Sequence, residues 1–475
     1  MPILCLYRGY FQIHSNRHVP TTRGVDPAKT PKPCAHEQVT ADDLTQLGPA
    51  LYECMAHVIE GSVEKTDRSF MKISKLASVV DGPLQRMSRI IAHSLARRLI
   101  CPVQGFAAAL IDPSHYLEQS CLRAARENFA DISPYLSTGF VTINRAMLEQ
   151  VQDQKVVRIV DLSCSTTHQW QWIKILQDFH SRPGGPPELR LTVVHEDSEF
   201  LDNMQACLCK QAANLKLCFY FDKVIGKLET LDFSNLREIL KINFGEAVVI
   251  SCALQMHRLL AVDDSISRDF TAQLQQMANM ARLKQMACSA CSPASTLNYP
   301  QTPSPQRQIP SLLVSFLYAI RALEPKIIVM MEQDADHNAP LFHDRFTKTV
   351  DYYAALFDSL NAVDAASPQR ARVERVLLGE EIKNILVCEG VQRHERHERL
   401  SQWEMHMQRC EVDHVPLSFE AIREGKERLM SYGLKQCKSK EDKAGLLLCW
   451  GATRLYSISA WRPRSSNAAP NNVAG

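Results

Sequence analysis

The sequence predicts an α/β fold, in which a doubly wound, mainly parallel sheet follows an N-terminal helical cap and closes with a C-terminal β-hairpin. Three observations predict it. Leucines recur at helical spacing near the N-terminus, short apolar runs alternate with helical stretches from residue 155 onward, and two apolar runs flank Gly451. Short apolar runs that alternate with helices are typical of buried parallel strands joined by right-handed crossovers.

The composition is that of a globular protein with balanced charge. The 475-residue chain has 54 Lys and Arg against 52 Asp and Glu, and 45% of its residues are hydrophobic. Near-neutrality argues against nucleic-acid binding driven by bulk positive charge. No apolar run approaches the roughly 20 residues that span a bilayer. The 16 cysteines are scattered along a long chain, which indicates reduced thiols rather than a secreted disulfide framework.

The N-terminal part reads as a leader followed by helices. Residues 1–43 are expected to be a disordered leader, because they show no apolar period. Residues 44–150 are expected to form a mostly helical cap. Apolar side chains at spacings of three and four define one face of its first helix, which Gly61 ends: Leu44, Leu47, Leu51, Met55 and Val58.

The α/β core is expected over residues 151–463. Its strands are predicted at 155–162, 188–196, 216–226, 246–254 and 325–334, with the hairpin at 445–461. Residues 284–311 are rich in Pro, Ser, Thr and Gln, and they predict a disordered insertion in this core. Residues 464–475 are expected to be a disordered tail.

The loop after the first predicted strand decides whether a cofactor is expected. Ligands of doubly wound sheets bind at the carboxyl ends of the strands, and this loop, residues 161–167, reads DLSCSTT without a glycine. A dinucleotide or S-adenosylmethionine site needs glycine there, so that the backbone can approach the ligand. We therefore expect no cofactor and no catalytic residue. An enzyme that binds S-adenosylmethionine remains the alternative.

Two clusters of polar residues could carry chemistry. His394 and His397 lie in QRHERHERL (392–400), but they are three residues apart instead of four, with arginines between them. This spacing predicts a solvated helix face with ion pairs and no metal site. At the end of the last parallel strand, Glu332, Asp334, Asp336 and His337 could form a catalytic carboxylate pair. We favour helix capping and salt bridges to Arg345 or Lys348.

Other sequence signals point to protein contacts rather than nucleic acid. Four lysines between 435 and 443 are diluted by acids and predict a solvated loop. A leucine stripe at helical spacing usually packs in a core, but an α-helical cap beside a sheet without a catalytic loop is also the architecture of a docking module. The candidate partner surface comprises Leu47, Leu51, Leu254, His257, Leu259 and Leu260.

Five sequence blocks, in order, resemble the plant GRAS-domain family, and its SCARECROW-like group in particular. The leucine-rich helices at 44–100 come first, then VRIVDL (157–162) with QWQWIKIL (169–176), and EAVVISCALQMHRLLA (246–261). The fourth block is PKIIVMMEQDADHN (325–338) with GEEIKNILVCEGVQRHERHERLSQW (379–403), and the fifth is LLLCWGATRLYSISAW (446–461). The resemblance covers about residues 45 to 463.

The resemblance implies a methyltransferase-like, Rossmann-type core without known catalysis in a nuclear transcriptional regulator. Many members are coregulators that dock on C2H2 zinc-finger transcription factors or on other GRAS proteins, so DNA contact is expected to be indirect. Homodimers and heterodimers are both compatible with this mode. The branch that fits best implies gibberellin response and root development. Direct, sequence-specific DNA binding is a further alternative.

The resemblance also implies which residues anchor the family motifs. One position departs from the pattern: Arg158 replaces the usual His in a buried strand, and it would need a carboxylate partner there. Gln392 and His394 stand where the family prefers Glu and Val. The expected anchors are Asp161, Gln169, Trp170, Glu332, His337, Arg396, Glu398, Trp403, Trp450 and Trp461.

Overall fold

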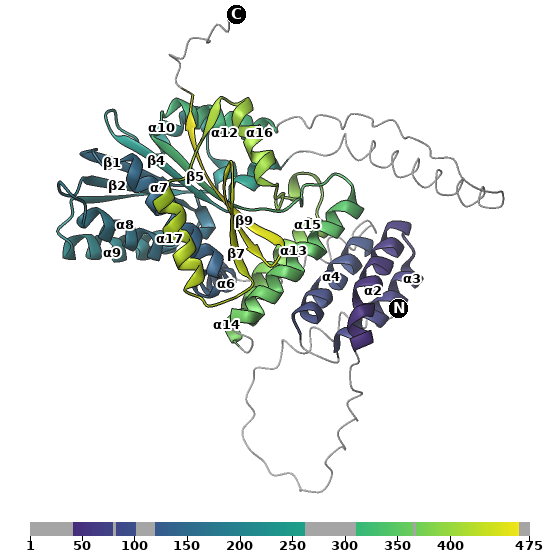
Figure 1. The fold of residues 1–475 in the computed structure, drawn as a ribbon. Coiled ribbons are helices and arrows are strands. Elements are labelled where there is room, and N and C mark those ends of the chain that lie inside the picture. The colour runs from purple at the N-terminus through teal and green to yellow at the C-terminus, as the bar shows by residue number, and fades with distance from the viewer. Residues whose placement is uncertain (1–40, 79–81, 101–118, 262–309, 364–366, 465–475) are drawn as a thin grey trace, which may run out of the picture. The chain divides into compact units, whose positions relative to one another are not determined.

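The computed structural model describes residues 41–78, 82–100, 119–261, 310–363 and 367–464, in two compact units (Figure 1). The first unit lies within Met1–Tyr116 and the second within Leu117–Gly475. The expected leader (1–43), insertion (284–311) and tail (464–475) fall almost wholly outside the described residues. None of the described helices is long and apolar enough to cross a bilayer.

The N-terminal unit is a bundle of three helices that pack on one another: α2 (Ala41–Glu60), α3 (Val63–Ser78) and α4 (Pro83–Ile100). The leucine period predicted α2 and α4, and Gly61, with φ of +71°, ends α2 as expected. The helical cap was expected to continue to residue 150. Instead, α6 (Gln119–Ile132) and α7 (Pro134–Gln150) belong to the second unit. Helix α7 packs against strands of the sheet, so it forms part of the α/β core.

The second unit is built on one mixed sheet with the strand order β3-β2-β1-β4-β5-β9-β8-β7. The parallel strands lie where the apolar runs predicted them: β1 (Val156–Asp161), β2 (Glu188–His195), β3 (Phe219–Ile225), β4 (Ala247–Ala253) and β5 (Ile327–Gln333). Ile159 at the centre of β1 lies opposite Leu191 on β2 and Val249 on β4. These residues are apolar on both faces because helices cover both faces.

The antiparallel half of the sheet is larger than the sequence predicted. The hairpin of β8 (Gly445–Trp450) and β9 (Thr453–Pro463) turns at Gly451, with φ of +58°, and β9 pairs antiparallel with β5. Two further strands were not predicted: β6 (Val412–Val415) pairs with β9, and β7 (Cys437–Asp442) pairs with β8. Lys438 and Lys440 therefore lie on an edge strand instead of a solvated loop. Lysines are common on edge strands because they hinder pairing with other chains.

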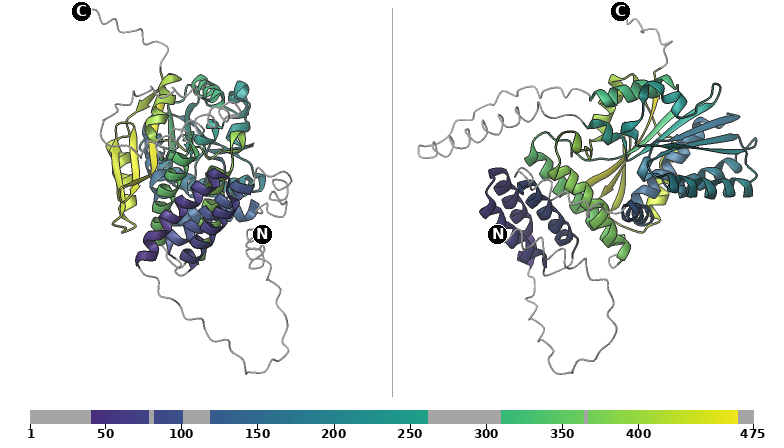
Figure 2. Two further views of the ribbon diagram at one scale, coloured as in Figure 1. Left: turned by 90° about the vertical axis from the view of Figure 1, so that its right-hand side faces the viewer. Right: turned by 180° about the vertical axis from the view of Figure 1, so that it is seen from behind.

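Helices cover both faces of the sheet (Figures 1 and 2). On one side lie α7, α8 (Gln169–His180), α9 (Ser198–Asn214) and α17 (Phe419–Met430), and on the other α10 (Leu236–Ile239), α12 (Ser311–Ala322) and α16 (Leu400–Arg409). The second side encloses the core cluster that contains Phe316, Trp403 and Trp461. Helix α13 (Phe342–Val363) packs on β8 and β9. After α13 come α14 (Pro368–Arg372), the π-helix η6 (Val373–Leu378) and α15 (Gly379–Val387).

Short 3-10 helices connect several of these elements. They are η2 (Cys164–Thr166), η3 (Leu228–Thr230), η4 (Phe233–Asn235), η5 (Met256–Leu260) and η7 (Gly390–Gln392). Helix η2 follows β1 and η5 follows β4, so both lie at the carboxyl ends of parallel strands. This is the edge of the sheet at which folds of this type bind ligands.

Candidate functional site

The loop after β1 is closed by its own side chains. Asp161, the last residue of β1, is fully buried. It accepts hydrogen bonds from the backbone N–H of Ser163 at 2.8 Å, from Nε1 of Trp172 at 3.0 Å and from the hydroxyl of Thr167. Burial raises the pKa of Asp161, although these hydrogen bonds oppose the rise. Asp161, one of the expected family-motif residues, therefore holds the loop in place and is not exposed to solvent.

Cys164 in this loop is also committed to packing. It adopts a left-handed backbone conformation, with φ of +47°, and its side chain is buried in the core cluster. Burial raises the pKa of its thiol well above the ordinary value. A reactive cysteine needs an accessible thiolate, so Cys164 lacks the properties of a nucleophile.

The carboxylate that follows β2 is neutralised by cations. In dinucleotide-binding folds an acidic residue near this place binds a ribose hydroxyl. Here Glu196 lies 3.8 Å from Arg126 and 3.2 Å from Lys227. The N-cap of α9 is the next residue, Asp197, which accepts from the N–H of Phe200 at 3.0 Å. Glu196 thus serves in ion pairs with two cationic side chains.

The carboxyl ends of β4 and β5 meet in a buried junction of histidines and carboxylates. Glu332, on β5, accepts from the backbone N–H of Met256 through Oε1 at 2.7 Å. Its Oε2 lies 2.8 Å from Nδ1 of His257, the second residue of η5. Glu332 is fully buried and His257 is 2% exposed. The carboxylate of β5 therefore fixes both the backbone and the ring orientation of the segment that follows β4.

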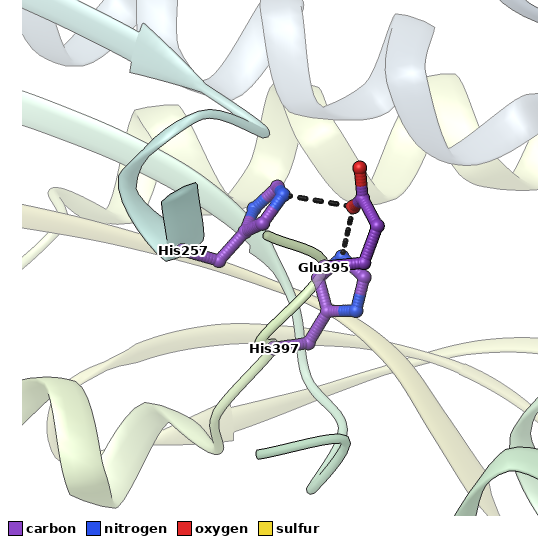
Figure 3. Close-up of side chains that lie close together, drawn as sticks. All are labelled: His257, Glu395 and His397. Atoms are coloured by element: carbon purple, nitrogen blue, oxygen red, sulfur yellow. Dashed lines mark ion pairs between the residues drawn. The ribbon is translucent and has the colours of Figure 1, made fainter. Parts of the chain in front are cut away.

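The opposite side of this junction comes from residues 393–399. Oε2 of Glu395 lies 3.0 Å from Nε2 of His257 and 3.3 Å from Nε2 of His397 (Figure 3). Its Oε1 accepts from Nη2 of Arg258 at 3.0 Å. Nδ1 of His397 lies 2.9 Å from Nδ1 of His337. Two histidines thus converge on one buried carboxylate.

The charges in this junction depend on one another. Burial lowers the pKa of His257, but the carboxylates of Glu332 and Glu395 outweigh it and raise the pKa to about 9. Burial and the charge of His257 lower the pKa of His397 to about 4. For Glu395, burial is outweighed by Arg258 and His257, which hold its pKa well below the ordinary value. The junction therefore holds one imidazolium between two carboxylates.

The prediction of a solvated helix face over 392–400 was wrong. Residues 393–399 form an extended segment before α16. Four charged or titratable residues in it are at most 6% exposed: Arg393, Glu395, His397 and Glu398. A charged segment is stable in the interior only when its charges are paired, and here they are. The polar composition concealed this burial. The burial of this segment could have been inferred from the resemblance to the GRAS family, because Arg396, His397 and Glu398 keep the family pattern.

The neighbouring charged residues hold the same segment in place. Arg396 donates to the carbonyls of Arg393 and Gly390, each at 2.8 Å. Glu398 accepts from Nδ2 of Asn338 and lies against Nε2 of His406, each at 2.7 Å. These contacts explain why both motif residues are buried.

The remaining carboxylates near β5 also serve the fold. Oδ1 of Asp334 accepts from the N–H of Leu400 at 2.7 Å and so caps the first turn of α16. The sequence favoured capping of the following helix over catalysis, but the helix that Asp334 caps is α16, which comes later in the chain than α13. Arg345, one of the two cations expected to pair with these carboxylates, forms an ion pair with Glu389.

Three of the tryptophans expected as anchors lie in the interior. Trp403 and Trp461 are fully buried in the same core cluster. Trp450 is 7% exposed and donates from Nε1 to Oδ2 of Asp358 at 2.7 Å. Their burial agrees with a role in stability.

Two other expected anchors are exposed. Gln169 and Trp170 lie on the outer side of the first turn of α8, and Trp170 is 38% exposed. The buried pair is Gln171 and Trp172. A helix turns by about 100° per residue, so a displacement of two residues changes which side chains face the sheet. The motif was recognised, but the inward residues within it were misassigned.

The leucine stripe assigned to partner contact is buried. Leu47 and Leu51 on α2 are fully buried, and Leu254 at 7% is the most exposed of the other four. Leu259 and Leu260 belong to the core cluster, and His257 belongs to the polar junction. A side chain without accessible surface cannot contact a partner in this conformation. The set is therefore core, as leucine stripes commonly are.

A partly exposed aromatic cluster, Trp170–Arg428–Tyr432, links Trp170 of α8 with Arg428 of α17 and with Tyr432, which follows α17. The guanidinium of Arg428 lies 5.9 Å from the ring of Trp170 and 5.0 Å from that of Tyr432. It donates to the hydroxyl of Tyr432 at 3.1 Å and to the hydroxyl of Ser137 at 3.2 Å. The cluster combines the three residue types most enriched at binding hot spots.

Known proteins show the same domain. The GRAS domain family matches residues 47–462. The chain belongs to the GRAS family. It is 34% identical to Scarecrow-like protein 3 of Arabidopsis thaliana, over 87% of this chain and 88% of that protein. It is also 34% identical to GRAS family protein TF80 of Medicago truncatula, over 87% of this chain and 94% of that protein.

More distant relatives agree with this assignment. DELLA protein GAIP of Cucurbita maxima is 28% identical over 88% of this chain and 62% of its own length. The crystal structure of SCL7 in Oryza sativa matches with a TM-score of 0.65 at 24% identity, over 87% of this chain and 99% of that chain. This likeness confirms the fold, including the mainly parallel sheet and the N-terminal helices.

Membership confirms the function class that the sequence predicted. This GRAS protein is a plant transcriptional regulator, and its DELLA relatives link it to gibberellin signalling. Its homologues are regulators and not known enzymes.

Proposed function

We propose that this GRAS protein is a nuclear coregulator that acts through protein contacts and catalyses no reaction. The observation that carries the proposal is the closed loop after β1, where Asp161, Thr167 and Trp172 are bonded to one another. A methyltransferase-like sheet binds its cofactor at this place. With these side chains filling the loop, the sheet supports a binding surface better than an active site.

The protein partners proposed from the resemblance are C2H2 zinc-finger transcription factors and other GRAS proteins. In this proposal the zinc-finger factor reads the DNA and this chain joins it without direct base contact. Two features support indirect DNA contact. The chain carries nearly equal numbers of acidic and basic residues, and many of its surface arginines are already paired with carboxylates, as Arg423 is with Glu420 and Glu427.

The Trp170–Arg428–Tyr432 cluster replaces the leucine stripe as the proposed contact for such a partner. Hydrogen bonds to Ser137 and Tyr432 hold Arg428 in place before binding. An ordered Trp and Arg lose little side-chain entropy when a partner covers them, which makes them effective anchors. The partner class itself comes from the family resemblance.

Fluorescence anisotropy tests the mode of action. The full chain is titrated into labelled promoter DNA at physiological salt, with and without a C2H2 zinc-finger protein bound to its DNA site. We expect no sequence-dependent binding by the chain alone and a further rise in anisotropy when the zinc-finger protein is present. Tight, sequence-dependent binding by the chain alone would overturn the proposal and support direct DNA recognition.

The proposed contact has a matched control within the chain. Trp170→Ala should weaken the zinc-finger complex at least about tenfold, as expected for a hot-spot aromatic. Phe244 is also exposed and also has an arginine above its ring, Arg237, at 5.2 Å. Phe244→Ala should leave the complex unchanged. Equal effects of the two substitutions would show that the Trp170–Arg428–Tyr432 cluster is not the contact.

A further inference from the structure

The buried junction also has the donor set of a metal site. We propose that His257, Glu395 and His397 bind one zinc(II) ion. One ligand atom from each side chain, a ring nitrogen of either histidine and a carboxylate oxygen, lies within 4.8 Å of the other two, and all three residues are buried. Imidazole nitrogen and carboxylate oxygen are both common zinc ligands. This inference does not depend on the proposed function.

The ligand atoms need only small movements to coordinate zinc. Ligands about 2.0–2.1 Å from a tetrahedral ion lie roughly 3.4 Å from one another. Oε2 of Glu395 is 3.0 Å from Nε2 of His257 and 3.3 Å from Nε2 of His397 (Figure 3). Small rotations of the two imidazole rings would lengthen these nitrogen–oxygen distances by the few tenths of an ångström that a zinc ion requires.

The Nε2 atoms that face the proposed site contact Glu395 without a hydrogen bond of good geometry. Among the described residues, Nε2 of His257 and Nε2 of His397 are buried atoms that make no hydrogen bond of acceptable geometry, although both face Glu395. A buried polar atom left unsatisfied costs about 1–3 kcal/mol. An ion placed between the three side chains would satisfy both nitrogens and the carboxylate at once. This is an observation independent of the residue types.

Residues around the three ligands hold them in the orientation that zinc needs. Nδ1 of His257 can donate its proton to Glu332, 2.8 Å away, and zinc binding would release the second proton of the imidazolium, which leaves the lone pair of Nε2 for the ion. Nδ1 of His397 can donate to Nδ1 of His337 at 2.9 Å, with the same result. Zinc-binding histidines usually donate their second N–H to a carboxylate or another acceptor in this way.

The second oxygen of Glu395 is also accounted for. Oε1 accepts from Arg258 at 3.0 Å, so Oε2 is the oxygen left for the ion. All three ligands therefore have a defined orientation before an ion arrives. In the sequence, His394 and His397 are three residues apart, which is the wrong spacing for two zinc ligands on one helix. The partner of His397 is instead His257, from a distant segment, and His394 is 40% exposed on its side chain.

The position of the site indicates a structural role. His257 lies on η5, after β4, whereas Glu395 and His397 lie in the segment before α16. An ion held by both would cross-link two segments that are otherwise joined by hydrogen bonds and ion pairs. Because the side chains are buried, no substrate can reach the ion in this conformation. Zinc would therefore stabilise the junction rather than catalyse a reaction.

X-ray absorption spectroscopy of the zinc-loaded full chain tests the proposal. The protein is stripped with a chelator, titrated with zinc(II) against a chromophoric competitor, and measured at one equivalent. We expect one tight site with nitrogen and oxygen scatterers at about 2.0–2.1 Å and imidazole scattering. The chain has 16 cysteines, so sulfur scattering at about 2.3 Å would place the ion elsewhere and overturn the proposal. Absence of tight binding would overturn it as well.

Two substitutions localise the site. His397→Gln should weaken zinc affinity at least about 100-fold, and Glu332→Gln, which removes the carboxylate behind His257, should weaken it about 10- to 100-fold. His414→Gln is the control, because His414 is a partly buried histidine that packs against Trp461, outside the junction. Unchanged affinity in His397→Gln would overturn the assignment. If His397→Gln fails to fold by circular dichroism, the absorption spectrum of the natural chain decides alone.

Discussion

Arg158, the buried third residue of β1, forms a bidentate ion pair with Glu246, which immediately precedes β4. Nε donates to Oε2 at 2.7 Å and Nη2 donates to Oε1 at 3.1 Å. Nη1 also donates to Asp222 at 2.7 Å and to the hydroxyl of Thr192 at 2.8 Å. The guanidinium thus joins β1, β2, β3 and the start of β4, and the carboxylate that the sequence required is present.

Removal of this guanidinium should destabilise the core strongly. Arg158→Met leaves Glu246 buried without its main counter-charge, and breaking a buried pair in this way costs about 3–5 kcal/mol. Denaturant unfolding followed by circular dichroism measures the loss. Arg423→Met is the control, since Arg423 pairs with exposed carboxylates, and solvent screens such pairs so that they contribute little to stability. Similar losses in the two variants would contradict a structural role for the Arg158 network.

Trp461 and Trp170 offer a matched test of which tryptophans stabilise the fold. Trp461 is fully buried on β9, whereas Trp170 is 38% exposed on α8. Trp461→Ala should lower the free energy of unfolding by about 3–5 kcal/mol because it leaves a cavity. Trp170→Ala should cost about 1 kcal/mol, mostly its contact with Arg428. An unchanged melting curve for Trp461→Ala would exclude it as an anchor.

Glu381 should make stability depend on pH. Burial, and then the charge of Glu395, raise its pKa to about 7 from the ordinary 4.5. It accepts from the hydroxyl of Tyr353 at 2.9 Å and from the amide of Gln333 at 3.3 Å. Since the folded state holds the proton more tightly than the unfolded state, stability from this group is complete below about pH 4.5 and is lost as pH rises through about 7.

Glu381→Gln should remove that dependence. Relative to the natural chain, the variant should gain stability between pH 5 and pH 8, by up to about 3 kcal/mol. Unfolding free energies at the two pH values, compared between the variant and the natural chain, provide the measurement. Glu380→Gln is the control, because Glu380 lies at the surface beside Lys383. A difference between natural chain and variant that does not grow with pH would contradict the assignment.

S-adenosylmethionine should not bind. The loop after β1 is filled by Thr167 and Trp172, which both contact Asp161, so a cofactor would have to displace buried side chains. Isothermal titration calorimetry with the full chain should show no saturable heat at micromolar concentrations. Saturable binding would mean that this loop opens, and it would favour the methyltransferase-like enzyme over the coregulator.

The local hydrophobic pattern was sufficient to predict the parallel strands but not the edge strands. The runs that became β1 to β5 are apolar on both faces, because helices cover both sides of the sheet. Strand β7 has the sequence CKSKED and is mostly exposed. Its pairing with β8, the next strand along the chain, stabilises it, and an exposed edge strand carries no hydrophobic period to detect.

The candidate site was the least predictable part, because it is built from long-range contacts. Residues 392–400 are dense in charge, which locally indicates solvent exposure. In the fold, Glu395 meets Arg258, 137 positions earlier in the chain, and the charges satisfy one another away from water. The family resemblance identified Arg396 and Glu398 as motif residues. The charge pattern of the same segment nevertheless predicted a solvated surface.

The sequence by itself determined the alternation of strands and helices, the family, and the need for a carboxylate beside Arg158. These follow from short-range periodicity, from motif order and from the cost of an unpaired buried charge. The tertiary structure alone decided that Glu246 supplies that carboxylate, that Trp172 faces the interior while Trp170 faces solvent, and that His257 meets Glu395 and His397. The physical reason is that burial and pairing depend on which distant segments come together, and composition does not encode that arrangement locally.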